Sequence, residues 1–371
     1  MIGTTRVPYE GPDEYDILAL GEAPGGEEAG TGRPFVGKSG QLLERYFNRL
    51  NIDRSEIKLA NLSKRRPSVN PPSNRFELLL GSPELEEDLN ALEEEIKRAK
   101  PNVIIALGGW PMYFLTGHCG KEHGKDKPGS GILTYRGSRF HALERWGKEQ
   151  KVFCTLHPAY LTRNWKWNPV WYTDLSAAVE DSKFPELRLP IYEEHIDPEP
   201  DVLYDLTHEA ISSSWISVDL ETFRKTRGKY SCVGWAYEKD GLMKGVCVTH
   251  LRDDLTRYSK EMWESDTPKI FQFGTYDIPL MRTFYQWRIG GYYNGVGWDT
   301  YVASANIYPD FPRALEFLTS IYTRFPYYKD EGKAGPDTED PDAHWKYNIK
   351  DTVGTYQVAM AQMEDIGEIY G

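Results

Sequence analysis

Acidic side chains stand in a regular pattern in residues 216–222, which read ISVDLET. Apolar residues alternate there with Ser217, Asp219 and Glu221. Side chains two apart on a β-strand share a face, so the apolar set would face a core and both carboxylates would point the other way. Two like charges on one face repel, and a bound cation would relieve that repulsion. For an isolated Asp-x-Glu, the plain alternative is an edge strand with a solvated polar face.

Two later stretches supply further acids. Residues 269–281 (KIFQFGTYDIPLM) predict a strand, a turn and a helix start, which places Asp277 in the first helical turn. In residues 344–356, Tyr347 and Asp351 are four apart and therefore share one helix face. Four carboxylates can hold two Mg²⁺ or Mn²⁺ ions roughly 3.5–4 Å apart, one to activate water and one to stabilise a leaving oxygen. The predicted metal ligands are Asp219, Glu221, Asp277 and Asp351.

In this order, D-x-E, Y-D-x-x-x-M and Y-x-x-x-D resemble the three exonuclease motifs of the DEDD family with tyrosine in the third, the proofreading 3′→5′ exonuclease of family A DNA polymerases. Residues 298–305 (WDTYVASA) and 320–329 (SIYTRFPYYK) are similar to the equivalent region of bacteriophage family A polymerases, and the resemblance covers residues 205–371. It implies an RNase H-like (DnaQ-like) domain with a mixed sheet, in which Tyr347 orients the attacking water. One departure is Phe273, where family members often have asparagine.

A glycine-rich stretch in the first half lies between a predicted strand and a predicted helix. Residues 21–40 read GEAPGGEEAGTGRPFVGKSG, and within them residues 32–39 match the P-loop spacing G-x-x-x-x-G-K-S. A P-loop follows its strand directly, whereas this one begins about twelve residues after Leu20. A nucleoside triphosphatase is therefore the less favoured alternative.

The same stretch resembles the first motif of family 4 uracil-DNA glycosylases, which reads G-E-A-P-G followed by G-R-P-F-V-G-x-x-G-Q-L-L. Residues 60–67 (ANLSKRRP) and 156–161 (LHPAYL) resemble two further motifs in the same order, and the resemblance covers residues 14–182. It implies a three-layer α/β/α fold with a parallel central sheet. It also implies a pocket for a base drawn out of the DNA stack.

The resemblance gives several side chains a role. Phe35 would stack on the pyrimidine, Asn61 would pair with its edge, and Glu22 would position or activate water beside the sugar. His157 would hydrogen-bond the uracil oxygen as a neutral imidazole. Taken singly, these could be a core residue, a turn residue, an acid near a helix N-terminus and a strand-end cap. The predicted base-binding residues are Gly21, Glu22, Ala23, Phe35, Asn61 and His157.

A second group of residues is expected to contact DNA. Residues 159–163 (AYLTR) would enter the gap left by the displaced base, and a basic group at residues 64–66 would contact phosphate. The predicted DNA contacts are Lys64, Arg65, Arg66, Tyr160, Leu161 and Arg163.

The cysteines argue against the iron–sulfur cluster that family 4 enzymes carry. That family has cysteine in a K-C-R-P motif, where this chain has Lys64-Arg65-Arg66-Pro67, and no cysteine precedes Cys119. We therefore expect no cluster, and other packing must brace the loop. The four cysteines stand far apart with no C-x-x-C, so neither a disulfide framework nor a zinc ribbon can be inferred. Residues 67–70 contain no histidine, which argues against covalent capture of the product.

Charge and periodicity divide the 371 residues into two parts. The net charge of −12 argues against a protein that coats nucleic acid nonspecifically, and nearly all of it falls after residue 187. Strand-like runs alternate with helix-like segments in the first part, which predicts a parallel sheet with helices on both faces. We expect domains at 1–185 and 204–371, joined by a proline-rich and acidic linker at 186–203. The predicted strands are 16–20, 57–60, 103–107 and 151–156, and the predicted helices are 38–50, 83–99 and 169–181.

The two resemblances together imply a phage-type replication or repair protein. A metal-dependent 3′→5′ DNA exonuclease would be joined to a uracil-DNA glycosylase-like domain, and it would supply proofreading to a separately encoded polymerase. Two alternatives stay open: the glycosylase-like domain is inactive and only binds DNA or a partner, or the nuclease prefers RNA. No run of 18 apolar residues and no signal-peptide pattern is present. We therefore expect a cytoplasmic protein without a membrane partner.

Overall fold

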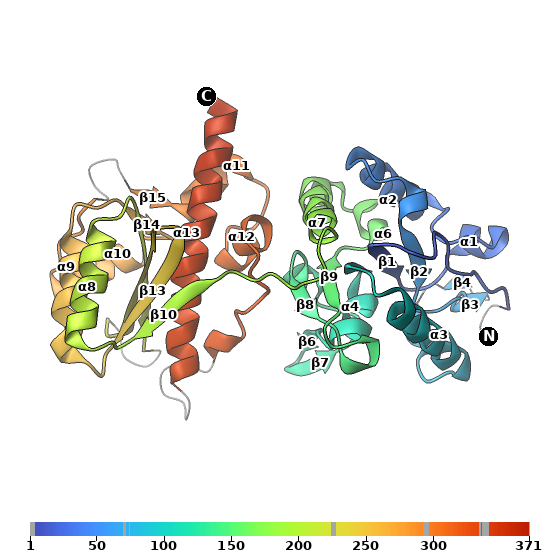
Figure 1. Cartoon of the computed structure of the whole chain (residues 1–371), viewed down its shortest axis with the longest axis horizontal. Helices are drawn as coiled ribbons and strands as arrows, with labels where there is room; N and C mark the ends of the chain where they lie inside the picture. Colours follow the sequence, from blue (N-terminus) through green and yellow to red (C-terminus); the bar gives the residue numbers. More distant parts are fainter. Residues whose placement is uncertain are drawn as a thin grey trace. The chain divides into compact units, whose positions relative to one another are not determined.

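The computed structural model describes residues 4–69, 72–73, 75–223, 228–291, 297–333, 335 and 341–370. The chain divides into two compact units, Met1–Arg188 and Leu189–Gly371, each with its own sheet and its own core (Figure 1). Among the described residues, no helix combines the length and the apolar character needed to cross a bilayer.

The first unit contains a five-stranded sheet with the strand order β2-β1-β5-β9-β8. Four of its five strands are parallel: β1 (Ile17–Gly21), β2 (Lys58–Asn61), β5 (Val103–Leu107) and β9 (Lys151–Thr155). All four lie within one residue of the predicted strands. The edge strand β8 (Arg139–His141) is antiparallel to β9 and was not predicted, because three residues are too few to show a period.

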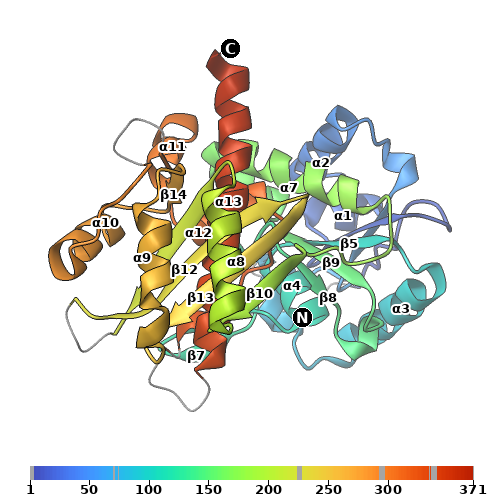
Figure 2. The ribbon, with the colours of Figure 1, turned by 60° about the vertical axis from the view of Figure 1, so that its left-hand side comes forward.

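Helices cover both faces of this sheet, which confirms the predicted three-layer fold (Figure 2). From β1 the chain passes through α2 (Lys38–Arg49) to its neighbour β2, and from β2 it passes through α3 (Pro83–Ala99) to β5, on the other side of β1. The two connections run in opposite directions along the sheet. Because both are right-handed, α2 and α3 lie on opposite faces. Helix α3 begins where its sequence predicts, because Ser82 accepts a hydrogen bond from Leu85 N at 3.2 Å. The remaining helices of the unit are α1 (Gly26–Thr31), α4 (Gly109–Thr116), α5 (Ile132–Tyr135), α6 (Pro158–Leu161) and α7 (Asn168–Asp181). Short strands and 3₁₀ turns complete it: β3 (Ser68–Val69), β4 (Pro72–Ser73), β6 (Gly120–Glu122), β7 (Lys125–Lys127), η1 (Arg54–Glu56), η2 (Phe76–Leu79), η3 (Glu144–Trp146) and η4 (Trp165–Trp167).

The second unit contains a six-stranded mixed sheet with the order β10-β13-β12-β11-β14-β15. Strands β11 (Ile216–Thr222), β12 (Tyr230–Lys239) and β13 (Leu242–Thr249) form an antiparallel meander. Strands β14 (Lys269–Phe271) and β15 (Trp298–Asp299) then run parallel to β11 on its other side. A meander followed by parallel strands beyond its first strand is the order of the RNase H-like fold, as predicted.

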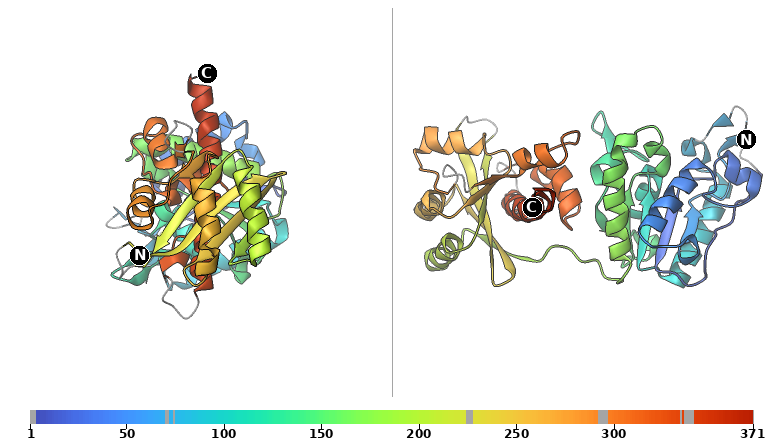
Figure 3. Two further views of the ribbon diagram at one scale, coloured as in Figure 1. Left: turned by 90° about the vertical axis from the view of Figure 1, so that its left-hand side faces the viewer. Right: turned by 90° about the horizontal axis from the view of Figure 1, so that it is seen from above.

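The two faces of this sheet have separate cores. Val218 and Leu220 pack on one face beneath α8 (Pro200–Ile211) and α9 (Thr256–Glu264). The long helix α13 (Asp342–Tyr370) covers the opposite face (Figure 3). Because side chains alternate along β11, Asp219 and Glu221 point toward the face that α13 covers. The other helical segments are η5 (Asp253–Leu255), α10 (Asp277–Leu280), a π-helical turn at Met281–Tyr285, α11 (Thr300–Ile307), α12 (Leu315–Tyr322) and η7 (Glu331–Lys333).

The segment predicted as a linker is only partly a connection. Its residues Tyr192–Ile196 form the edge strand β10, which pairs in parallel with β13, and α8 begins at Pro200. Asp197, directly after β10, accepts hydrogen bonds from Thr249 N at 2.8 Å and Thr249 Oγ1 at 2.6 Å, and these bonds stabilise the pairing of β10 with β13. The strand was missed because its pairing with β13 depends on residues fifty positions away, whereas the local sequence is dominated by acids and prolines.

Candidate functional sites

A pocket of about 740 Å³ opens at the carboxyl ends of the parallel strands in the first unit. Residues that end or follow β1, β2, β5 and β9 line it, because the carboxyl ends of parallel strands meet at one edge of a sheet. The pocket brings together five of the six predicted base-binding residues. These are Glu22, Ala23, Phe35, Asn61 and His157, and the pocket is also lined by Tyr160 and Arg163.

The sixth predicted residue, Gly21, lies directly beneath two of the others. A Cβ atom at Gly21 would stand 2.5 Å from Asn61 Oδ1 and 2.7 Å from Phe35 Cζ. Only glycine therefore lets the amide and the ring approach the strand end. Phe35 is 5% exposed and Asn61 is 7% exposed, so both side chains are held by the fold before any ligand arrives.

His157 is the N-cap of α6, and its Nδ1 atom accepts a hydrogen bond from Ala159 N at 3.1 Å. Burial, and after it the charge of Arg163, lowers the pKa of His157 to about 4. The imidazole is therefore neutral near pH 7. Since Nδ1 is an acceptor, the ring proton is on Nε2, where it can be donated to a ligand.

Glu22 lies close to His157 in the same pocket. Burial, and after it the charge of Glu77, raises the pKa of Glu22 to about 7. Gly108 has φ +102°, and a Cβ atom there would lie 3.1 Å from both Glu22 Oε1 and the Cβ atom of His157. Gly108 was not predicted, although the Gly-Gly pair that follows the apolar strand Val103–Leu107 was a signal for a close approach.

One predicted DNA contact, Leu161, is wrong, and two others, Arg65 and Lys64, stay predictions although each has a partner within the unit. The side chain of Leu161 is fully buried, so it packs in the core of the unit. The Arg65 guanidinium pairs with Glu87 at 3.0 Å and Asp88 at 3.2 Å, and its side chain is 13% exposed. The Lys64 ammonium lies 4.1 Å from the centre of the Tyr9 ring. The spacing of a short motif could not reveal that Glu87 and Asp88 of α3 pair with Arg65 or that the Tyr9 ring lies against Lys64. Arg66, Tyr160 and Arg163 stay predicted DNA contacts.

The fully buried Asp88 carboxylate is the centre of this network. It accepts hydrogen bonds from Lys64 N at 2.8 Å, Ser63 Oγ at 3.2 Å and Arg65 Nη1 at 3.2 Å, and it pairs with Arg6 at 3.3 Å. One buried acid on α3 therefore holds both the loop after β2 and the N-terminal segment.

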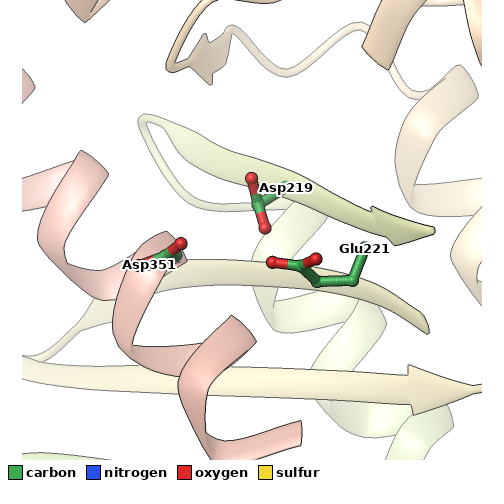
Figure 4. A group of neighbouring side chains, drawn as sticks. All are labelled: Asp219, Glu221 and Asp351. Carbon is green, nitrogen blue, oxygen red and sulfur yellow. The ribbon is translucent and has the colours of Figure 1, made fainter. Parts of the chain in front are cut away.

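In the second unit, Asp219 and Glu221 on β11 meet Asp351 on α13 (Figure 4). Each offers a carboxylate oxygen, and the three oxygens lie within 4.8 Å of one another. Burial, and after it the charge of Asp351, raises the pKa of Asp219 to about 7. Hard divalent cations bind such clustered carboxylates, so these residues fit Mg²⁺ or Mn²⁺.

Asp277 lies outside this close trio but next to it. It is the first residue of α10 and is 4% exposed. Burial, and after it the charge of Asp219, raises the pKa of Asp277 well above its ordinary value. All four predicted ligands therefore share one buried acidic neighbourhood.

Lys329 is a residue that sequence reasoning missed at this site. Its ammonium donates to both oxygens of Asp351 at 2.6 Å and to Tyr347 Oη at 3.0 Å. Asn348 Nδ2 donates to Asp219 Oδ2 at 2.7 Å, and Tyr328 Oη donates to Asp351 Oδ1 at 2.7 Å. The stretch at residues 320–329 carried the signal, because it ends in two tyrosines followed by this lysine.

Phe273 leads into the turn before α10 with a left-handed φ of +63°. Asp299 holds this turn by accepting hydrogen bonds from Phe273 N at 3.2 Å and Gly274 N at 2.9 Å, and it also caps α11. The Phe273 side chain is 48% exposed and packs on the Tyr301 ring at 4.8 Å. Asparagine tolerates this backbone conformation better than phenylalanine does.

These features define the first unit as an α/β/α domain with a pocket of about 740 Å³ at its strand ends. A sequence profile described as the uracil DNA glycosylase superfamily matches residues 8–178. The Type-4 uracil-DNA glycosylase of Archaeoglobus fulgidus is 32% identical over 156 residues, which cover 42% of this chain and 71% of that protein. The Type-4 uracil-DNA glycosylase of Thermotoga maritima is 34% identical over 164 residues, which cover 43% and 73%. The chain belongs to the uracil-DNA glycosylase superfamily through this unit.

Solved structures similar to part of the chain include RNase D of Trypanosoma brucei, at 15% identity and a TM-score of 0.38, covering 46% of this chain and 64% of that one. Another is RNase D of Escherichia coli, at 16% identity and a TM-score of 0.35, covering 47% and 46%. The chain spans less than two thirds of either protein. The fold of the second unit is therefore inferred from its own strand order, and its candidate site from its own carboxylates.

Proposed function

We propose that the first unit excises uracil from DNA and that the second unit is a metal-dependent 3′→5′ exonuclease. The first proposal rests on the neutral His157, which lies in one pocket with Glu22 and Asn61. Its Nδ1 atom accepts a hydrogen bond from Ala159 N, so the ring proton is on Nε2. The observation that carries the second is the cluster of three carboxylates, Asp219, Glu221 and Asp351, whose oxygens lie within 4.8 Å of one another.

In the proposed excision, the base enters the pocket and stacks on Phe35, while the Asn61 amide hydrogen-bonds its edge. As the bond between the sugar C1′ and the base N1 breaks, its electron pair moves into the uracil ring. His157 Nε2–H donates a hydrogen bond to the uracil oxygen on which negative charge develops, without transferring its proton. Ionised Glu22 holds water against C1′ on the face away from the leaving base and takes up its proton.

In the proposed nuclease, bound divalent ions would supply an activated water and neutralise the leaving 3′ oxygen. The chain's own residues would position the reacting groups. Tyr347 Oη accepts a hydrogen bond from the Lys329 ammonium, which fixes the position from which the phenol would orient the attacking water. Asn348 orients one oxygen of Asp219 through its amide.

Because the motifs of the second unit resemble those of bacteriophage polymerases, we further propose a phage-type replication or repair role in the cytoplasm. The exonuclease would remove mismatched 3′ ends for a separately encoded polymerase. Single-stranded DNA or DNA 3′ ends are the proposed substrate of the nuclease, and uracil-containing DNA is the proposed substrate of the first unit.

Uracil excision is tested by incubating the protein with a single-stranded oligonucleotide that contains one uracil, in EDTA, and measuring free uracil. Release is expected from the parent and lost in His157→Gln, whereas His141→Gln, an exposed histidine of the same unit, keeps it. Tight binding of the oligonucleotide with no release from the parent would instead favour a binding module.

The nuclease is tested with DNA and RNA labelled at the 5′ or the 3′ end, with and without Mg²⁺. We expect stepwise shortening from the 3′ end of DNA, loss in Asp219→Ala, and no loss in Asp254→Ala, which removes an exposed acid of the same unit. Faster shortening of RNA than of DNA would move the substrate assignment to RNA. Activity that survives in Asp219→Ala would refute the site.

A further inference from the structure

Trp165 is a large, solvent-exposed apolar side chain that follows, two residues later, a residue lining the first unit's pocket. It is 65% exposed, more than any other aromatic side chain among the residues that the structure describes. It begins η4, only two residues beyond Arg163, which lines the pocket together with Tyr160 and Thr162. Tryptophan is highly buried on average, so an indole this exposed is unusual.

The backbone on both sides of Trp165 is firmly held. Asn168 Nδ2 donates to the Trp165 carbonyl at 2.6 Å, and Asn168 Oδ1 accepts from Tyr46 Oη at 2.8 Å. On the other side, Asn164 N donates to the Tyr160 carbonyl at 3.0 Å, and the next aromatic of the turn, Trp167, is 9% exposed. The exposure of the indole is therefore built into a rigid turn and does not come from a loose loop.

Two cations flank the indole. Arg163 and Lys166 are both exposed, and neither forms an ion pair within the described part of the chain. An exposed aromatic ring between two unpaired cations matches a nucleic-acid strand, since the ring can stack on a base and the cations can contact the flanking phosphates. The two exposed positive charges next to the ring in sequence favour a polyanionic strand over a neutral protein surface.

We propose that Trp165 stacks on an unpaired DNA base next to the nucleotide held in the pocket, while Arg163 and Lys166 contact the neighbouring phosphates. The sequence had predicted a DNA contact for Leu161, but that side chain is buried. In this proposal, the turn that carries Trp165 contacts the DNA instead. The inference extends the proposed uracil excision by naming how the pocket holds the flanking strand.

The test uses a single-stranded oligonucleotide with a tetrahydrofuran abasic analogue beside 2-aminopurine, in EDTA, so that binding is read from fluorescence without any bond cleavage. Trp165→Ala is expected to weaken binding about ten-fold and to abolish the stacking-dependent quenching, because one base–aromatic stack is lost. Trp165→Phe keeps an aromatic face and is expected to stay within about three-fold of the parent. The matched control is Leu143→Ala, which trims a 46% exposed side chain elsewhere in the unit.

A second measurement addresses the cations. Replacing both Arg163 and Lys166 by alanine should reduce the slope of log affinity against log salt by about 1.4, the value for two phosphates on a single strand. The inference is overturned if Trp165→Ala binds as the parent does, if it weakens binding no more than Leu143→Ala, or if the parent does not bind the oligonucleotide. Absence of uracil release with the Trp165 effect intact would refute the excision proposal and leave the stacking surface standing.

Discussion

Replacing Glu22 by glutamine should stabilise the first unit at pH 8 while it abolishes uracil release. In the folded chain the pKa of Glu22 is raised to about 7 from an ordinary 4.5, chiefly by burial. The folded state therefore binds this proton more tightly than the unfolded state does. The resulting stability is present below pH 4.5 and is lost as the pH rises through 7.

The size of the effect follows from the shift. A difference between 4.5 and about 7 corresponds to about 3 kcal/mol, at ~1.36 kcal/mol for each pKa unit. Because Glu22 borders an open pocket, solvent screens part of this cost, and we expect about 1–3 kcal/mol. Glutamine has nearly the same volume and no charge, so it removes the cost of a buried carboxylate.

The assay compares urea denaturation of the parent and Glu22→Gln at pH 8 and at pH 5. The free energy of unfolding should be higher in the variant at pH 8, and the difference between the two proteins should shrink at pH 5, where Glu22 is largely protonated in the folded state. Glu149→Gln, an exposed acid of the same unit, should show neither effect. A variant that is less stable than the parent by the same amount at both pH values would refute this account of Glu22.

Three further outcomes are expected. The rate of uracil release by the parent should rise with pH through about 7, because Glu22 must ionise. His157, with a pKa near 4, should add no second step between pH 5 and 8. A rate that stays flat or falls with rising pH in that range would contradict this. Lys329→Met should slow the nuclease about 10–100-fold, because it removes the charged hydrogen bond to Tyr347. Lys329→Arg should recover part of the rate. An unchanged single-turnover rate in Lys329→Met would count against the positioning role. Asp88→Ala should lower the free energy of unfolding by about 1–3 kcal/mol, measured by urea denaturation, because it leaves the Lys64 N–H without its acceptor and removes one of the two carboxylates that pair with Arg65. No measurable loss would mean that other packing braces the loop.

The elements that the sequence predicted well are those fixed by short-range interactions. Strands β1, β2, β5 and β9 were located within one residue, because each is a compact apolar run bounded by turn residues. Helix α3 was located from Ser82 and Pro83, since an N-cap is a contact between residues three apart. Alternation along β11 likewise determined that Asp219 and Glu221 share a face.

Contacts between distant segments were decided only by the tertiary structure. The packing of helices over each loop decides where two side chains point. Leu161 is buried in the core, and Arg65 pairs with Asp88 of α3. The ammonium of Lys329 on Asp351 depends in the same way on how the stretch after α12 folds against α13.

The sequence by itself determined which residue types could do chemistry and which of them share a strand or a helix turn, because periodicity and capping act over a few residues. Only the tertiary structure decided which of these groups meet, how deeply they are buried and which cation faces which carboxylate. Desolvation and long-range packing set those features, and neither is encoded in the spacing of a motif.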